Sequence, residues 1–280
     1  MKSAALKVLA TAAITIAAAS SAFAADMAPR YTKAPPPVVP VYNWTGFYIG
    51  GNAGYSWGRS STDVSYHNNA NNALLATATG AFDMNGWVAG GQIGYNWQRD
   101  RWVLGVEADG QATGQKGRAL FTCAGPICSA GNTAIFPLTG APVNVALENK
   151  LDWFATFRGR AGYTFAPTVL GYVTGGLAVG GVSSSGVITG FNGVVASAAP
   201  FSADNTQVGW TVGAGLEASL GGNWTGKIEY LYLDLGRFNT SAVLLANAPP
   251  IRANISSRIT DNIARVGINY RFGGPVVAKY

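Results

Sequence analysis

Charged residues are scarce in this 280-residue chain. Lys, Arg, Asp and Glu together make up 11% of the sequence, whereas 48% of the residues are hydrophobic and 37 are Gly. An average soluble domain carries about 25% charged residues. The shortage of charge argues against an ordinary soluble domain, and we expect much of the chain to face something other than water.

The sequence also lacks a long apolar run suited to a membrane-spanning helix. Residues 161 to 203 contain no charged residue, but Gly pairs at 175–176 and 180–181 and a Ser run at 183–185 interrupt them. Each Gly in a helix interior costs ~1 kcal/mol relative to Ala. Lys/Arg clusters interleaved with aromatic residues are absent too, so no nucleic-acid partner is expected.

Only one His is present, His67, within SYHNNANN. A hydrolase or acyltransferase generally needs a His as general base, and His67 could pair with Asp63 or a nearby Ser. No motif places a nucleophile, a base and an orienting group together, and a single His is a poor metal ligand set. Glycine strings such as GWVAGGQIG lie within predicted strands, which excludes a dinucleotide loop. We predict no enzyme and no catalytic, metal or cofactor site.

The N-terminus reads as an export signal. Lys2 and Lys7 flank the start of an apolar run, residues 6 to 19, and the small-residue pattern AFA follows at 22–24. This pattern predicts a signal peptide, residues 1–24, that is removed on secretion. Residues 25–42 contain APPPVVPVY and are predicted to form an extended Pro-rich periplasmic leader. A partner-binding arm is the alternative, which no second motif supports.

The two cysteines, Cys123 and Cys128, lie close together in TCAGPICS. Exported thiols in an oxidising compartment usually pair, and the four intervening residues can turn tightly. We therefore predict a disulfide within a loop. The alternative, a metal site, lacks further Cys or His ligands.

From residue 43 onward the chain repeats segments of about ten residues that alternate in polarity. In FYIGGNAGYSW, residues 47 to 57, Phe47, Ile49 and Tyr55 share one parity, whereas Asn52 and Ser56 occupy the other. One face of such a strand meets lipid and the other meets a polar interior. The pattern predicts eight strands, at residues 47–57, 87–97, 102–113, 151–165, 169–182, 207–220, 224–234 and 261–272.

The predicted connections alternate in length. The segments QRDR, AP and GGN are tight turns, whereas four long polar segments are interpreted as loops: 58–86, 114–150, 183–206 and 235–260. Outer-membrane barrels place short turns in the periplasm and long loops outside. The predicted fold class is all-β: an eight-stranded antiparallel up-and-down transmembrane β-barrel, with both ends of the chain in the periplasm.

The Trp residues form two groups in this arrangement, and none lies in the middle of a predicted strand. Amphipathic indole rings prefer the membrane interface, so two girdles are expected of a membrane barrel. Trp44 is the exception in parity, because it falls on the interior side of its strand rather than on the lipid-facing side. The inner rim holds Trp44, Trp97, Trp102 and Trp224, and the outer rim holds Trp57, Trp87, Trp153 and Trp210.

Several segments resemble the outer-membrane immunogenic proteins, porin-like surface antigens of Gram-negative bacteria with barrels similar to OmpA and OmpX. They are NWTGFYIGGNAGYSWG, GWVAGGQIGYNWQ, RGRAGYTF, YVTGGLA, EYLYLDLG and ARVGINYRF. The resemblance implies a barrel over residues 43–272 in the cell outer membrane, with outer-membrane lipid and the barrel assembly machinery as partners. Such barrels usually end on an aromatic residue, and here either Phe272 or Tyr280 could serve. Since Gly273 to Pro275 would break a strand, we favour Phe272, with residues 273–280 as a short tail.

Ten charged residues are predicted to face the interior by parity. An eight-stranded barrel is only wide enough for side chains to fill, so these charges should form ion pairs in a mainly closed lumen. We place Arg158, Arg160 and Glu107 at its centre. The ten residues are Glu107, Asp109, Asp152, Arg158, Arg160, Glu217, Lys227, Glu229, Arg265 and Arg271.

The functions expected are envelope integrity and surface display, with long external loops that contact other cells or a host ligand the sequence does not identify. Two alternatives stay open. A porin for passive diffusion of small solutes would need an open lumen. An outer-membrane lipid-modifying enzyme would need a catalytic group around His67.

Overall fold

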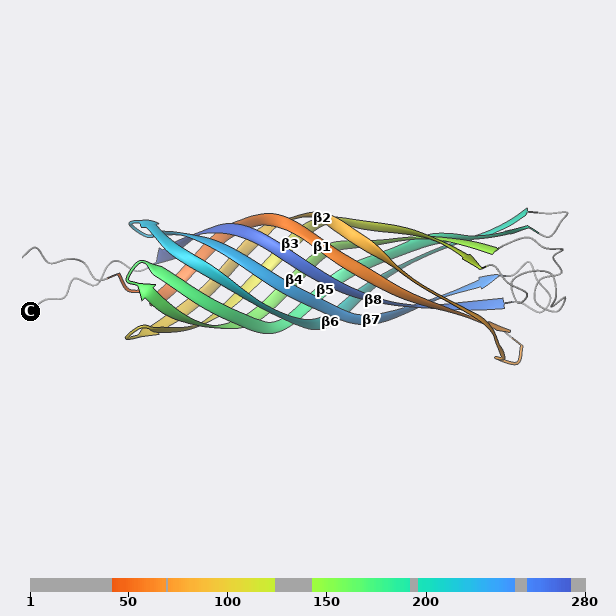
Figure 1. Ribbon diagram of the computed structural model, residues 1–280, viewed down its shortest axis with the longest axis horizontal. Coiled ribbons are helices and arrows are strands. Elements are labelled where there is room, and N and C mark those ends of the chain that lie inside the picture. Colours follow the sequence, from red (N-terminus) through yellow and green to blue (C-terminus); the bar gives the residue numbers. More distant parts are fainter. Residues whose placement is uncertain (1–41, 69, 124–142, 192–195, 245–250, 273–280) are drawn as a thin grey trace, which may run out of the picture. The chain divides into compact units, whose positions relative to one another are not determined.

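The computed structural model describes residues 42–68, 70–123, 143–191, 196–244 and 251–272, and all eight of its regular elements are β-strands. Each strand pairs antiparallel with the next, and the last pairs with the first, so the sheet closes into a barrel (Figure 1). The strands are β1 (Gly46–Asn68), β2 (Leu74–Arg99), β3 (Trp102–Cys123), β4 (Val143–Ala166), β5 (Val169–Phe191), β6 (Ala196–Gly221), β7 (Trp224–Leu244) and β8 (Ile251–Phe272).

Closure depends on the ladder between β1 and β8. Their pairing runs without a register shift from Phe47 opposite Phe272 to Asn68 opposite Ile251. The predicted eight-stranded antiparallel barrel is thus confirmed. Tight turns join strands at the end that holds Phe47 and Phe272, where Asp100 and Gly222 adopt positive φ angles of 55°. Within the described residues, no helix is long and apolar enough to cross a membrane.

A band of large apolar side chains covers the outside of the barrel. Every Trp except Trp44 is at least 43% exposed, as the predicted girdles require. Between the two Trp levels lie further exposed side chains, among them Ile49, Ile93, Leu104, Val106, Phe157, Val173, Leu177, Val212, Leu216, Ile228, Val266 and Ile268. A soluble protein would not leave so large an apolar surface in water, because burial of apolar area is the main gain of folding.

The prediction of long loops at 58–86, 114–150, 183–206 and 235–260 was wrong over most of their length. The strands continue well beyond the outer Trp level, and the described part of the β1–β2 connection is a short turn around Asn71 and Asn72. The extended end lies at the right of Figure 1. The barrel is therefore much taller than the apolar band, with a long segment on one side of it.

The chemistry of the two faces inverts where β1 leaves the apolar band. Up to Trp57, its apolar side chains point outward and its polar ones inward. Beyond Trp57 the outward side chains Ser61 and Asp63 are polar, and the inward ones change from Ser60 and Thr62 to the apolar Val64 and Tyr66. A strand passing from lipid into water must exchange its polar and apolar faces. Because the alternation keeps its period but reverses its polarity, the extension lacks the membrane-strand pattern.

A bulge changes the parity of β4. The pairing register shifts between Leu151 and Trp153 relative to both neighbours, and β3 inserts two residues, Thr113 and Gly114, at the same level. Bulges add a residue that re-aims the side chains beyond it. Inward-facing side chains of β4 are therefore even-numbered up to Phe154 from the turn end and odd-numbered from Leu151 outward.

Two substitutions on the outer face of β2 test the height of the apolar band. Ile93 and Thr79 both point outward, but only Ile93 lies within the band. We expect Ile93→Arg to lower the free energy of unfolding by ~2–4 kcal/mol, because a charge near the bilayer midplane is costly. Thr79→Arg should change it by less than ~0.5 kcal/mol. Urea titration of protein refolded into lipid vesicles measures both, and equal losses would contradict this placement of the membrane.

Candidate functional site: the barrel lumen

Eight charged side chains from five strands meet inside the barrel at the height of the apolar band. Alternation along each strand turns them inward, and each residue is at most 5% exposed. They are Glu107 and Asp109 on β3, Arg158 and Arg160 on β4, Glu217 on β6, Lys227 and Glu229 on β7, and Arg265 on β8. Four carboxylates face four cations, so the cluster, the lumen network, is electroneutral.

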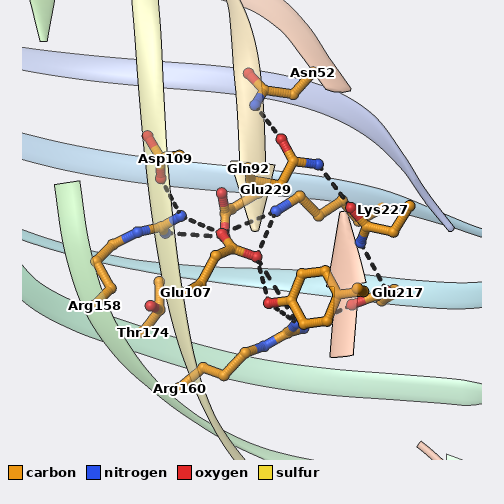
Figure 2. A network of polar contacts seen from close by, with 12 residues as sticks. Asn52, Gln92, Glu107, Asp109, Arg158, Arg160, Thr174, Glu217, Lys227 and Glu229 are labelled. Carbon is orange, nitrogen blue, oxygen red and sulfur yellow. Dashed lines mark hydrogen bonds and ion pairs between the residues drawn. The ribbon is translucent and has the colours of Figure 1, made fainter. Parts of the chain in front are cut away.

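The guanidinium of Arg158 joins three carboxylates of the lumen network, and Figure 2 shows it pointing toward Asp109 and Glu107. Its Nη2 donates to Glu107 and, at 2.7 Å, to Asp109 Oδ2, while its Nη1 donates to Glu229 Oε1 at 3.1 Å. The side chain is completely buried. One guanidinium therefore links carboxylates from two strands on opposite parts of the sheet.

Two further cations, Arg265 and Lys227, bind the same three carboxylates. Arg265 Nε donates to Glu229 Oε2 at 2.7 Å, and its Nη2 lies 3.2 Å from Asp109 Oδ2. Lys227 Nζ donates to both oxygens of Glu107 at 3.0 Å. Each of these carboxylates thus binds at least two cations, which is the condition for burying charge at tolerable cost.

Arg160 forms a second centre nearer the turn end. Its Nη2 donates to Glu217 Oε2 at 2.7 Å, and its guanidinium carbon lies 3.9 Å from the centroid of the Tyr172 ring. The Tyr48 hydroxyl donates to Glu107 Oε2 at 2.7 Å and the Tyr172 hydroxyl donates to Glu229 Oε1 at 3.0 Å. The tyrosines therefore connect the two centres and fill the space between them.

Amides extend the network toward the turn end. Gln92 Nε2 donates to Asn269 Oδ1 at 2.7 Å, and Asn269 Nδ2 donates to Glu217 Oε1 at 3.0 Å. Asn52 Nδ2 donates to Gln92, as Figure 2 shows. None of these neutral residues is among the ten predicted lumen charges, although the alternation along residues 47–57 already places Asn52 on the polar interior face.

Trp44 closes the lumen at the turn end. It is fully buried, its backbone N donates to Gln98 Oε1 at 2.6 Å, and its indole Nε1 donates to the Pro167 carbonyl at 3.2 Å. The guanidinium of Arg271 lies 4.4 Å from the ring centroid of Tyr42. The ring of Trp44 belongs to an apolar cluster with Val103, Leu170 and Tyr172.

Apolar side chains fill the lumen on the other side of the network. One cluster joins side chains of β2, β4, β5, β7 and β8, and a second lies farther along the extended end. Neither cluster was predicted. The second lies in segments that were interpreted as loops, whereas most of the first lies within predicted strands, for which only the charged lumen positions were assigned. The first includes Met84, Val88, Leu151, Phe154, Leu231, Leu233 and Ile263, and the second includes Val64, Tyr66, Val145, Ile188 and Ile255.

Asp261 is a buried carboxylate that the sequence analysis also left out. It is fully buried and accepts hydrogen bonds from Ser56 Oγ and Gln115 Nε2. Asp261 has the same odd parity as Arg265 on the same strand, and this alternation would have predicted that its side chain faces the lumen. The Ser56 hydroxyl and the Gln115 amide thus supply hydrogen bonds to a carboxyl group that has no access to water.

The structure separates Asp152 from the other predicted lumen charges. Its side chain is exposed on the outside of the barrel and accepts a hydrogen bond from Ser183 Oγ at 2.6 Å. The prediction for Asp152 was wrong because the bulge interrupts the parity of β4 at this residue. Arg271 does point inward, but it lies at the turn end beside Tyr42 rather than in the network.

The other sequence candidates do not assemble a catalytic group. His67 Nδ1 lies 3.3 Å from the Asn72 carbonyl and Nε2 lies 3.2 Å from Ser65 Oγ, while Asp63 instead contacts Arg237 at 3.4 Å. In the part of the chain that the structure describes, no group of His, Cys, Asp and Glu is placed to hold a metal ion. The predicted disulfide falls outside the described residues, because Cys128 is not among them.

Comparison with known proteins identifies relatives along nearly the whole chain. A family model, the outer membrane protein beta-barrel domain, matches residues 9–272. The 31 kDa outer-membrane immunogenic protein of Brucella melitensis is 37% identical over 272 residues, covering 95% of this chain and 100% of the relative. The 22 kDa outer membrane protein of Rhizobium leguminosarum is 31% identical over 198 residues, covering 71% of this chain and 67% of the relative.

Solved barrels align only distantly. The outer membrane protease OmpT from Escherichia coli is 10% identical, with a TM-score of 0.42, covering 80% of this chain and 97% of the other. The attachment invasion locus protein of Yersinia pestis is 12% identical, with a TM-score of 0.28, covering 77% and 98%. Neither alignment supports a functional conclusion.

Removing the central cation of the lumen network should be strongly destabilising. We expect Arg158→Met to lower the free energy of unfolding by about 3–5 kcal/mol, because it leaves buried carboxylates short of a partner. Arg237→Met, which breaks the exposed pair with Asp63, should cost less than ~1 kcal/mol. Urea titration in lipid vesicles, followed by Trp fluorescence, compares them. A loss below 1 kcal/mol for Arg158→Met would show that the network does not hold the lumen together.

Proposed function

Because this chain belongs to the outer membrane protein β-barrel family, we propose that it is a closed, non-enzymatic barrel that strengthens the outer membrane and displays its extended end at the cell surface. The protein is located in the outer membrane, as its relatives are. The family rule for short and long ends assigns the tight turns to the periplasm and the extended end to the outside.

The filling of the lumen at three successive levels is the observation that carries this proposal. Trp44 and its apolar neighbours occupy the turn end, the electroneutral network occupies the middle, and two apolar clusters occupy the extended end. Fully buried side chains such as Arg158 and Phe154 pack the interior among the described residues, and this packing supports a lumen without a continuous path for water or ions. The proposed role therefore relies on the outer surface and the external end.

The two alternatives are less well supported by the described residues. A selective pore normally shows an excess of one sign of charge along its lumen, whereas this network is electroneutral. A lipid-modifying enzyme would need a base paired with a nucleophile and an orienting group, whereas His67 contacts Ser65 without a carboxylate partner. Surface display requires neither an open lumen nor a catalytic group.

Single-channel recording tests the closed lumen. Purified protein refolded into planar bilayers should show no large, steadily open conductance. Arg158→Met should remain closed, because the apolar clusters still block the extended end. A porin whose gate was the charge network would instead open in this variant. Stable conductance steps in the wild-type protein would overturn the proposal and favour diffusion of small solutes.

Epitope insertion tests the surface display. A short epitope placed after Asn71, in the turn between β1 and β2, should be bound by antibody on intact cells. The same epitope after Asp100, in the turn between β2 and β3, should be bound only after the outer membrane is permeabilised. The two turns lie at opposite ends of the same strand, β2, so they form a matched pair. The reverse pattern would invert the orientation.

A further inference from the structure

Four polar side chains form a row on the outside of the barrel just beyond the outer Trp level. Asn85 lies opposite Lys116, Lys116 lies opposite Lys150, and Lys150 lies opposite Ser183, on β2, β3, β4 and β5. Asn85 and Lys116 are exposed, and Lys150 and Ser183 are partly exposed. We call these four residues the cationic row. Since adjacent strands lie about 4.8 Å apart, it presents hydrogen-bond donors at regular intervals.

Two lysines directly opposite each other are unfavourable unless an anion lies between them. Glu148 forms no ion pair with Lys116, because it binds Lys150 at 3.0 Å and Arg118 instead. Within the described residues Lys116 has no ion pair, and like charge therefore stays uncompensated in the cationic row. Hydrogen bonds from Lys150 and Arg118 lower the pKa of Glu148, so that carboxylate remains an anion. Its negative charge is already paired with these two cations.

Most exposed cations elsewhere on the extended end are matched to carboxylates, and the exception is Arg252, which stands opposite His67 and Val243. Arg237 lies 3.4 Å from Asp63, and Arg258 lies close to Asp234, which is itself buried. Arg59 stands directly opposite an acidic residue, Asp83, on β2. Even with the exposed Asp152 included, the three cations of this patch, Lys116, Arg118 and Lys150, outnumber its two carboxylates.

The β4 bulge is what brings Lys150 to the outer surface. If Asp152 took a regular place in the alternation, the parity set by Arg158 and Phe154 would turn Lys150 into the lumen. The bulge instead sends Leu151 inward, where it packs in the apolar cluster, and Lys150 outward beside Lys116. Bulges are common at the rims of barrels, where they change the direction of side chains. This bulge, which interrupts two ladders, turns Lys150 into the cationic row.

Indole rings place the cationic row at the height of lipid headgroups. Trp87 lies two residues from Asn85 on β2, and a Cβ on Gly114 would lie 2.2 Å from the Trp87 Nε1 atom, so only Gly leaves room for this ring. Trp153 covers Gly181 in the same way, at 2.3 Å. Since aromatic girdles mark the edge of the hydrocarbon region, donors about 7 Å farther along the strands face the headgroups.

We propose that the cationic row binds the phosphate of an outer-leaflet lipid. Two ammonium groups and the Asn85 amide beside them can donate charge-assisted hydrogen bonds to the several oxygens of a phosphomonoester, whereas the Ser183 hydroxyl already donates to Asp152. The neighbouring indoles cover the apolar part of the same lipid. The proposal rests on the orientation given under the proposed function, because the row faces the outer leaflet only if the extended end is external.

Native mass spectrometry of the full mature protein, refolded in detergent, tests this proposal. The probes are a bis-phosphorylated glycolipid of the lipid A type and the same glycolipid without phosphates. Wild-type protein should retain the phosphorylated lipid in preference to the other by about tenfold or more. This is the preference expected when two surface cations each contribute to binding the phosphate. Lys116→Gln with Lys150→Gln should abolish this preference. The matched control, Arg237→Gln with Arg252→Gln, also removes two exposed cations and should keep it.

Three further measurements make the outcome decisive. Lys116→Arg with Lys150→Arg should retain the preference, and Lys116→Gln alone, at an exposed position, should reduce it if the double variant fails to fold. Inorganic phosphate at millimolar concentration should leave the lipid bound. An undiminished preference in folded Lys116→Gln/Lys150→Gln protein, or full displacement by inorganic phosphate, would overturn the proposal. Conductance and epitope exposure do not depend on these lysines, so failure here is separable from failure of the proposed function.

Discussion

The structure depends on one constraint: a backbone surrounded by lipid must satisfy all of its hydrogen bonds within the protein. A sheet meets this demand only by closing on itself, and here the ladder from Phe47–Phe272 to Asn68–Ile251 joins the last strand to the first. Eight strands enclose an interior about as wide as the side chains that fill it. Every inward-facing residue must therefore find its partners inside the barrel.

The lumen meets this requirement by separating its chemistry into layers. The charged residues lie together at mid-height, where Arg158 and Arg265 each contact several carboxylates, and apolar clusters lie on both sides of them. Replacing such a network with hydrophobic residues is often neutral or stabilising in other proteins, so a buried ion network is not by itself a sign of high stability. A stronger consequence is specificity, because a register shift of one residue would send these charges into the lipid.

The bulge at Asp152 links the interior to the membrane surface. By shifting the parity of β4, it lets Leu151 and Leu147 pack inside the extended end while Lys150 and Glu148 face outward. The same strand carries Arg158 and Arg160 into the network on the other side of the bulge. One extra residue thereby adapts a single strand to a polar lumen within lipid and to an apolar core in water.

Much of this fold could be predicted from the sequence. Alternation in segments such as residues 47–57 depends only on the local period of a strand, and the positions of Trp57 and Trp97 mark the two interfaces directly. The neighbouring positions of Glu107 and Arg158 followed from the parity and order of antiparallel strands. These features are local, or follow from simple up-and-down connectivity, so the chain itself determined them.

Tertiary structure decided what local pattern could not. Residues 58–68 have the period of a strand but the inverted polarity of a barrel in water, which only a completed barrel distinguishes from a polar loop. Asp152 points outward because of a bulge whose register is set by two neighbouring strands. Trp44, with no strand of its own to impose a parity, is buried because side chains from β3 and β5 surround it once the barrel closes. Each of these outcomes depends on contacts between residues far apart in sequence, which alternation along one strand does not encode.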